Sequence, residues 1–267
     1  AFMTLLKGAQ KQGVVSKEVD YLQLDESEKI DFLTTLKGDL LPEKFSDDLV
    51  NKTLGSIRAI QKIQSQNGEL GCHRYIISNN QTAQNIFEVF AMIRLSNWES
   101  PTVDVAPLFE TISDLSIAPK VMDVVYSDPT YRNHLRTRGD KQTIMLGFSD
   151  GTKDGGYLMA NWSIFRAKEE LTKVSRKHGV KALFFDGRGG PPARGGGNTH
   201  QFYASLGDSI ESDEIQITVQ GQTISSNFGT INSCQYNLEQ LLSSGIANRV
   251  FNNSSSEFSD EDRQTMV

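Results

Sequence analysis

The sequence predicts an α/β fold in which parallel strands alternate with helices. Short apolar runs recur along residues 71–230, and they are Tyr75–Ser78, Val103–Glu110, Thr143–Phe148, Val180–Phe185 and Glu214–Gln220. The stretches between these runs have helical periodicity, and the clearest series is Ala160, Ile164, Ala167, Leu171 and Val174. Strands that are apolar throughout and separated by helices are typical of parallel β/α units.

Both ends of the chain are expected to be helical. In residues 1–70, the acidic stretch Asp25–Glu28 precedes apolar residues at helical spacing, which is typical of a helix start. Residues 231–267 form the second helical segment, whose acidic end, Ser259–Asp262, is typical of a helix cut short. The start at Ala1-Phe2-Met3 is not a natural initiation, so we expect one structural domain of a larger protein.

Composition narrows the class of protein. The net charge of −6 does not favour nucleic-acid binding as the main task. Cys72 and Cys234 lie far apart without metal-ligand spacing, which favours free thiols in a reducing cytoplasm. No apolar run approaches the ~20 residues that a membrane span needs. We therefore expect a cytoplasmic protein without a nucleic-acid or membrane partner.

An arginine- and glycine-rich loop follows the fourth apolar run. Six of the eleven residues from Gly187 to Gly197 are glycines, and the only charged residues among them are Arg188 and Arg194. Glycines allow a close backbone approach to a ligand, and arginines bind phosphate or carboxylate in fork geometry. The loop therefore predicts an anion site. A flexible segment or a long hairpin is the alternative, and the ordered-looking sequence on both sides disfavours it.

Polar residues follow the other strands as well. Glu110 ends the second run, Asp150 and Lys153 follow the third, and Gln220 ends the fifth. Ligands bind at the carboxyl ends of strands in parallel β/α folds. Two carboxylates near basic side chains are a composition for Mg²⁺ or Mn²⁺ together with a phosphate ester. Either carboxylate alone is better explained as a helix N-cap than as a metal ligand, but their joint placement with basic partners favours a metal site.

Four segments carry a resemblance to a known family. Residues 144–156 (IMLGFSDGTKDGG) are similar to the signature Ile-Met-x-Gly-Tyr-Ser-Asp-Ser-x-Lys-Asp-x-Gly of phosphoenolpyruvate carboxylase, with departures at Phe148 and Gly151. The other three are PLFET, GRGG followed by RGGGNTH, and TVQGQ, and they match further segments of the family in the same order. The chain thus resembles the central and carboxyl-terminal part of that family's catalytic barrel.

The resemblance implies a partial TIM-like (β/α) barrel over residues 71–230, with about five parallel strands and flanking helices. It also implies a lyase that fixes carbon dioxide: phosphoenolpyruvate and bicarbonate give oxaloacetate and phosphate with Mg²⁺ or Mn²⁺. Such an enzyme is cytoplasmic and anaplerotic, and it replenishes the tricarboxylic acid cycle. Relatives are homotetramers, and an inhibitor of the aspartate type is a possible further ligand.

The same resemblance implies roles for individual residues. The implied metal ligands are Glu110 and Asp150. The substrate phosphate would be held by Lys153 and Arg188, and Arg194 would stabilise the carboxyphosphate intermediate. The pocket would be lined by Gln220, while Leu108 and Met145 would form an apolar niche for carbon dioxide.

One position departs from the pattern. Most relatives have a histidine immediately before the GRGG segment, and this chain has Asp186. An aspartate is the weaker base at neutral pH. Asp186 is therefore expected to take a positioning or base role, or to hydrogen-bond Arg188 while another group acts as base. His134 and His178 are expected on helix or loop surfaces.

The chain also lacks two family segments, an amino-terminal catalytic histidine and an early arginine motif, so the isolated chain is expected to be inactive. Two alternatives stay open. One is a non-catalytic relative that binds an anion and regulates. The other is another barrel enzyme that uses phosphoenolpyruvate or pyruvate and transfers phosphoryl groups.

Overall fold

The computed structural model describes residues 2–16, 19–191, 195–250 and 260–266. The chain forms two compact units, one from residues 1–106 with 124–140 and the other from residues 107–123 with 141–267. Within the described residues, none of the helices combines the length and apolarity that a membrane span requires.

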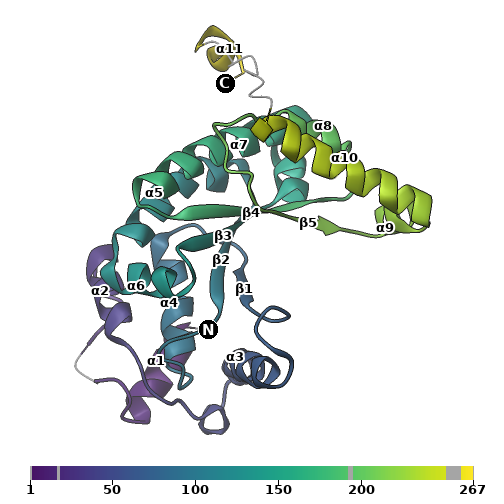
Figure 1. The fold of residues 1–267 in the computed structure, drawn as a ribbon. Helices are drawn as coiled ribbons and strands as arrows, with labels where there is room; N and C mark the ends of the chain where they lie inside the picture. Colours follow the sequence, from purple (N-terminus) through teal and green to yellow (C-terminus); the bar gives the residue numbers. More distant parts are fainter. Residues whose placement is uncertain (1, 17–18, 192–194, 251–259, 267) are drawn as a thin grey trace. The chain divides into compact units, whose positions relative to one another are not determined.

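The described strands form one sheet in the order β1-β2-β3-β4-β5 (Figure 1). They are β1 (Arg74–Ile77), β2 (Asp104–Phe109), β3 (Lys141–Leu146), β4 (Lys181–Gly189) and β5 (Ile215–Val219). The pairs β2–β3, β3–β4 and β4–β5 are parallel. Strands that follow one another in the sequence are thus neighbours, and helices connect them. The predicted α/β class and its five parallel strands are confirmed.

The first unit is mainly helical. Its helices are α1 (Phe2–Lys11), α2 (Glu26–Thr35), the short 3₁₀ helix η1 (Pro42–Lys44), α3 (Asp48–Asn67), α4 (Ala83–Arg94) and α6 (Pro129–Thr137). The acidic stretch does start a helix: the Asp25 side chain accepts a hydrogen bond from the Glu28 N–H, and Glu28 accepts one from the Asp25 N–H. This reciprocal capping satisfies two backbone donors that the first turn leaves unpaired.

The expectation that His134 lies on a surface is wrong, because its side chain is buried in the core of this unit. Residues Tyr131, His134 and Leu135 of α6 are all buried, and their spacing of three and one gives a continuous helix face. The His134 ring lies 5.0 Å from that of Phe90 and 5.7 Å from that of Tyr131. Burial, together with the nearby Arg138 charge, lowers the pKa of His134 to about 4.

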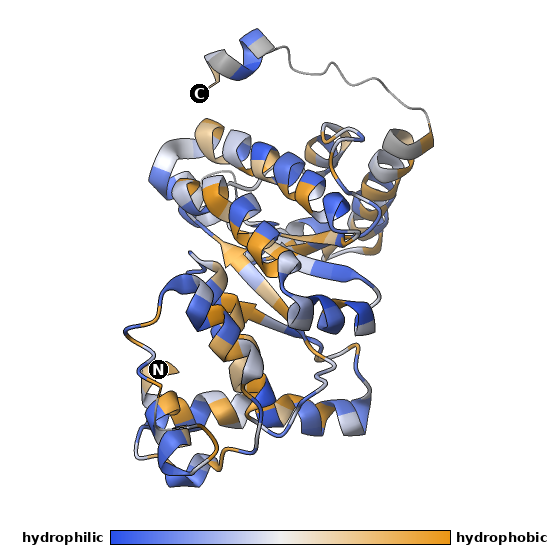
Figure 2. Cartoon of the chain, turned by 90° about the vertical axis from the view of Figure 1, so that its left-hand side faces the viewer, coloured by the Kyte–Doolittle hydropathy of each residue, from blue (hydrophilic) through white to orange (hydrophobic). Residues whose placement is uncertain are grey.

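The second unit carries the remaining elements. Its helices are α5 (Ile112–Ser127, of which residues 124–127 belong to the first unit), α7 (Phe148–Lys177), α8 (Thr199–Ala204), α9 (Gln222–Phe228), α10 (Ile231–Val250) and α11 (Asp260–Thr265). Apolar residues, orange in Figure 2, concentrate in the strands and on the helix faces that cover them. Helix α7 has a kink at Gly156, whose φ of 80° and ψ of 170° are not helical. Glycine adopts such a positive φ without steric cost.

Strand register in this unit separates two rows of side chains. Paired positions place Phe109, Leu146, Asp186 and Ile217 in one row, and Leu108, Met145, Phe185 and Gln216 in the next. Successive residues of a strand point to opposite faces of the sheet. The first row is the one that α7 covers, because Lys168 of α7 contacts Asp186. Leu108 and Met145 therefore share the opposite face.

The end of β4 lies unusually close to β5. A Cβ atom at Gly189 would come within 1.5 Å of the carbonyl oxygen of Thr218, and the register shifts between Asp186 and Gly189. Only glycine fits such an approach without a shift of the backbone. The glycine that follows Arg188 thus has a packing reason in addition to any role in binding.

Candidate active site

Glu110 and the start of α7 lie together at the carboxyl ends of β2 and β3. The Gly147 N–H donates a 2.8 Å hydrogen bond to the carbonyl of Phe109. A Cβ atom at Gly147 would lie 3.0 Å from the Glu110 Cα, so the chain leaving β3 passes directly beside Glu110. Helix α7 begins there, with Gly147 as its N-cap. This places Asp150 in the first turn of a helix rather than in a loop.

Asp150 and Lys153 contact each other. The Lys153 Nζ lies 2.7 Å from Asp150 Oδ1, and the two side chains are 65% and 48% exposed, respectively. An ion pair this exposed contributes little to stability, on the order of 0–1 kcal/mol. Both groups can therefore exchange this contact for a ligand at small cost.

Arg188 occupies a very different environment. The residue is 4% exposed, and its guanidinium carbon lies 4.2 Å from the centre of the Phe202 ring and 5.6 Å from that of Phe148. It donates hydrogen bonds to the carbonyls of Gly195 (3.0 Å) and Asn198 (3.4 Å). Burial lowers the pKa of Arg188. An arginine nonetheless stays charged, so the structure holds a fixed positive charge beside the glycine-rich loop.

The second half of the glycine-rich loop packs against the start of α7. The Tyr157 hydroxyl donates a 3.2 Å hydrogen bond to the carbonyl of Gly196. Gly195 has a φ of 76°, and a Cβ atom there would lie 2.7 Å from the Thr152 hydroxyl oxygen. The loop therefore lies against the helix turn that carries Asp150 and Lys153. Arg194 lies outside the described residues.

The remaining predicted residues lie around these elements. Leu108 and Met145 are paired across β2 and β3 and are both half-buried. Gln220 is exposed at the end of β5, and its N–H donates to the carbonyl of Gly189. Glu110, Asp150 and Arg188 thus lie around one segment, the start of α7. The roles expected for these residues stay predictions.

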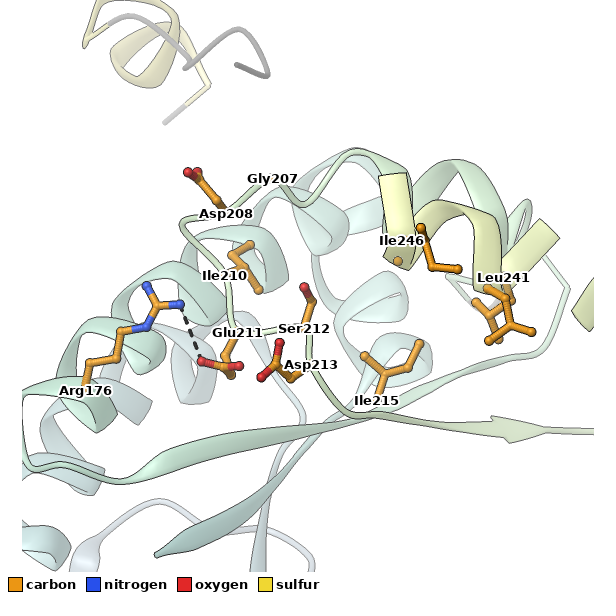
Figure 3. A pocket seen from close by; sticks show the side chains of 12 residues that line it. Arg176, Gly207, Asp208, Ile210, Glu211, Ser212, Asp213, Ile215, Leu241 and Ile246 are labelled. Atoms are coloured by element: carbon orange, nitrogen blue, oxygen red, sulfur yellow. Dashed lines mark hydrogen bonds and ion pairs between the residues drawn. The ribbon is translucent and has the colours of Figure 1, made fainter. Parts of the chain in front are cut away.

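Two cavities of the second unit lie at opposite ends of the strands. One, of about 280 Å³, is lined by Arg188, His200 and residues of β5, α9 and α10, and neither Glu110 nor Asp150 belongs to its lining. A larger one, of about 440 Å³, lies beside Ile215 at the start of β5 (Figure 3). Its charged rim includes Arg176, paired with Glu211 at 3.4 Å. Since β5 starts there, this cavity lies at the end of the strands opposite to the predicted site.

Asp186 is completely buried and faces α7. It accepts hydrogen bonds from the Lys168 ammonium at 2.7 Å and from the Tyr203 hydroxyl at 2.5 Å. The sequence reasoning missed both partners. Lys168 did carry a signal, because it lies four residues after Ile164 and three before Leu171, on the apolar face of α7. A lysine on such a face needs a buried anion, and the strand residue Asp186 is the one that meets it.

The donor set at the candidate site fits a hard divalent cation. Glu110 and Asp150 each offer carboxylate oxygens, and within the part of the chain that the structure describes no third histidine, cysteine, aspartate or glutamate joins them in a metal-binding group. Mg²⁺ is commonly held by one or two carboxylates while water and substrate complete its coordination. The oxygen donors of Glu110 and Asp150 are of the type that Mg²⁺ or Mn²⁺ prefers.

Comparison with known proteins identifies the family of this chain. The family model described as phosphoenolpyruvate carboxylase matches residues 10–266. This chain belongs to the phosphoenolpyruvate carboxylase family. Similar curated members, each named phosphoenolpyruvate carboxylase, come from Gloeobacter violaceus (34% identical over 235 residues), Nitrosomonas europaea (36% over 237) and Corynebacterium diphtheriae (36% over 236).

Each of these alignments covers 85% of this chain, but only 25%, 25% and 26% of the respective relative. The chain therefore spans about a quarter of the length of the phosphoenolpyruvate carboxylases that it matches. This coverage is enough to assign the chain to the family. It does not by itself assign to the chain the activity or substrates of a whole carboxylase.

Proposed function

We propose that this chain forms part of the catalytic barrel of a phosphoenolpyruvate carboxylase. Such an enzyme carboxylates phosphoenolpyruvate with bicarbonate and releases oxaloacetate and phosphate. The observation that carries the proposal is the arrangement around the start of α7. Glu110 lies beside Gly147, Asp150 pairs with Lys153, and Arg188 stacks over Phe148 of the same helix turn.

Charge explains why the reaction would use these residues. When bicarbonate attacks phosphorus, negative charge accumulates on the transferring phosphoryl group, and fixed positive charges offset it. Arg188 and Lys153 would bind this group. Glu110 and Asp150 would hold Mg²⁺ or Mn²⁺, which when bound supplies Lewis-acid stabilisation of the negative charge on pyruvate enolate.

Carbon dioxide released beside the enolate must be trapped before it escapes or meets water. The half-buried pair Leu108 and Met145 would form an apolar niche for it. Closure of the glycine-rich loop would exclude water and bring Arg194 to the carboxyphosphate. Gln220 would line the pocket at the end of β5.

The wider setting is proposed from the family. The whole enzyme would be a cytoplasmic, anaplerotic homotetramer that feeds the tricarboxylic acid cycle, with an inhibitor of the aspartate type as a further ligand. The isolated chain would be inactive, because the family's catalytic histidine and early arginine motif have no counterpart in it. Measurable bicarbonate-dependent oxaloacetate formation by the isolated chain would contradict this.

The metal site can be tested on the chain alone. We expect Mn²⁺ to bind, as followed by the electron paramagnetic resonance signal of free Mn²⁺, and Glu110→Gln and Asp150→Asn each to weaken binding at least tenfold, because each removes one of two charged ligands. Glu214→Gln is the matched control, since Glu214 pairs with Lys141 away from the site. Equal Mn²⁺ affinity in all four proteins would contradict the assignment.

Carboxylation is tested by a chimera in which this chain replaces the matching segment of the Corynebacterium diphtheriae relative. We expect the chimera to consume phosphoenolpyruvate only with bicarbonate present, and Arg188→Ala to lower its kcat/KM by at least 100-fold. A folded chimera that binds Mn²⁺ but turns over no substrate would instead support the alternative of a non-catalytic anion-binding relative. The buried Asp186 in place of the family histidine is the observation that favours that alternative.

A further inference from the structure

A buried charged cluster lies beneath Arg188, and the proposed function does not use it. It consists of Asp186 on β4, Lys168 on α7 and Tyr203 on α8. Asp186 and Lys168 have no exposed surface, and Tyr203 is 3% exposed. Three polar side chains from three elements therefore meet inside the second unit.

The contacts within this cluster are directional. The Lys168 ammonium and the Tyr203 hydroxyl both donate to the same Asp186 oxygen, Oδ2. The ammonium also lies 5.1 Å from the ring centre of Phe184, 5.1 Å from that of Phe202 and 5.5 Å from that of Tyr203. Aromatic faces attract a cation, so the lysine is held by one carboxylate and three rings.

Helix α8 connects the cluster to Arg188, because it carries both Tyr203 and Phe202. The Phe202 ring lies 4.2 Å from the Arg188 guanidinium carbon. Phe202 is also the neighbour of Tyr203 in the chain, and the rings of Phe202 and Tyr203 are 5.2 Å apart and nearly perpendicular. A helix of six residues is not stable by itself, so tertiary contacts set its position. The Tyr203–Asp186 bond ties this helix to the strand that carries Arg188, two residues beyond Asp186.

Free energy favours a geometric role over a stabilising one. A buried ion pair often contributes no more to stability than apolar residues of the same size, yet removal of one partner is costly because it leaves the other charge uncompensated. Burial lowers the pKa of Lys168, and the carboxylate of Asp186 opposes that shift. The pair therefore keeps its geometry only while both members are present.

We propose that Lys168, Asp186 and Tyr203 are positioning residues that hold α8, and through it the Phe202 ring, against the Arg188 guanidinium. They thereby set the direction in which Arg188 presents its fork to an anion. Asp186 acts through Arg188 and not as a base, because its carboxylate has no exposed surface and is bound to two donors. The inference rests on the proposed function only for what Arg188 binds.

The test follows Arg188 itself, in the isolated chain. Phenylglyoxal modifies exposed guanidinium groups, and peptide mass spectrometry gives a separate rate for each arginine. We expect Tyr203→Phe to raise the rate at Arg188 at least threefold, because α8 loses its bond to Asp186. Tyr21→Phe is the matched control, since Tyr21 is also buried and its hydroxyl donates to the carboxylate of Glu88 in the first unit, and the exposed Arg166 is the internal reference. An unchanged rate at Arg188 would overturn the proposal.

The route through Phe202 has its own test. Phe202→Leu removes the ring under Arg188 and leaves the three polar residues intact, so it should raise the Arg188 rate by a similar factor. Residues that act through one contact do not have additive effects. The double variant with Tyr203→Phe should therefore react no faster than Phe202→Leu alone. Additive increases would show that Tyr203 does not act through Phe202.

A double variant tests the loss of the Lys168 and Asp186 charges together, so that neither charge is left buried without its partner. Lys168→Met with Asp186→Asn removes both, and we expect a cooperative melt together with an Arg188 rate at least threefold above that of the unchanged chain. A folded double variant with fully protected Arg188 would refute the positioning role. None of these measurements uses carboxylase activity, so failure of the proposed function would not be confused with failure of this inference.

Discussion

At the scale of single residues, Asp186 is the most informative position. From the sequence it could be a base, a positioning group or a hydrogen-bond partner of Arg188. Its hydrogen bonds instead go to Lys168 and Tyr203, on the side of the sheet that α7 covers. The aspartate at this position is therefore paired with a lysine that comes from another element, α7.

This link makes a prediction for the family residue. Asp186→His alone should lower the melting temperature by roughly 10 °C, because Lys168 then has no counter-charge in the interior. Adding Lys168→Met to Asp186→His removes the uncompensated charge and should restore most of the lost melting temperature. The measurement is a thermal melt of the four proteins in the cycle. A single variant that is as stable as the unchanged chain would mean that the interior accepts the lysine without a carboxylate.

Glu110 and Asp150 show how residue type and fold combine at this scale. Their carboxylates were recognisable from the sequence as candidate metal ligands. Helix α7, however, starts at Phe148, so Asp150 lies in its first turn, where the helix dipole favours a negative charge. The helix N-terminus thus accounts for part of the preference for a carboxylate at this position, and Mn²⁺ binding separates the two explanations.

At the scale of elements, apolar periodicity predicted correctly which segments are helices and which are strands, but it predicted less well the residues at which they begin and end. All five strands lie within a few residues of the expected runs. The apolar series from Ala160 to Val174 marked α7, but the helix begins twelve residues earlier, because Gly156 makes a kink that joins two helical stretches. A glycine-rich segment that continues a helix across a kink leaves no periodic signal.

Helix α6 supplies a prediction about pH. The pKa of His134 is about 4 in the folded protein, whereas an unfolded histidine titrates near 6.5. Between these values the unfolded chain binds a proton that the folded chain does not, so stability falls as the pH drops from about 6.5 to 4. The full loss is about 3 kcal/mol.

Urea unfolding at a series of pH values checks this expectation. His134→Gln cannot titrate, so its stability should change less over this range than that of the unchanged chain. His73→Gln, a substitution at a half-exposed position of the same unit, is the control and should keep the full pH dependence. Equal pH dependence in all three proteins would mean that His134 is not the group whose protonation changes the stability.

At the scale of the whole molecule, the described chain leaves an apolar helix face in water. Helix α10 exposes five large aliphatic side chains, which are Ile231, Leu238, Leu242, Ile246 and Val250. Exposed apolar surface that is continuous along a helix usually marks a contact with other protein.

The exposure of α10 can be checked by substitution. Leu242 is 65% exposed, so Leu242→Ala should change the free energy of unfolding by less than about 0.5 kcal/mol. Leu171→Ala, the same change at a fully buried position of α7, should cost about 2–5 kcal/mol. Urea unfolding measures both. A large loss for Leu242→Ala would show that this face is covered in solution, by a second copy of the chain.

The sequence alone determined the class of fold, the five strands, and the residue types that accumulate at the strand ends, because apolar periodicity and short motifs are local properties. Only the tertiary structure decided which of these residues meet. The pairing of Asp186 with Lys168 and Tyr203, the burial of His134 and the stacking of Arg188 on Phe202 depend on register and helix packing. Such contacts join residues that are far apart in the chain, so no local pattern encodes them.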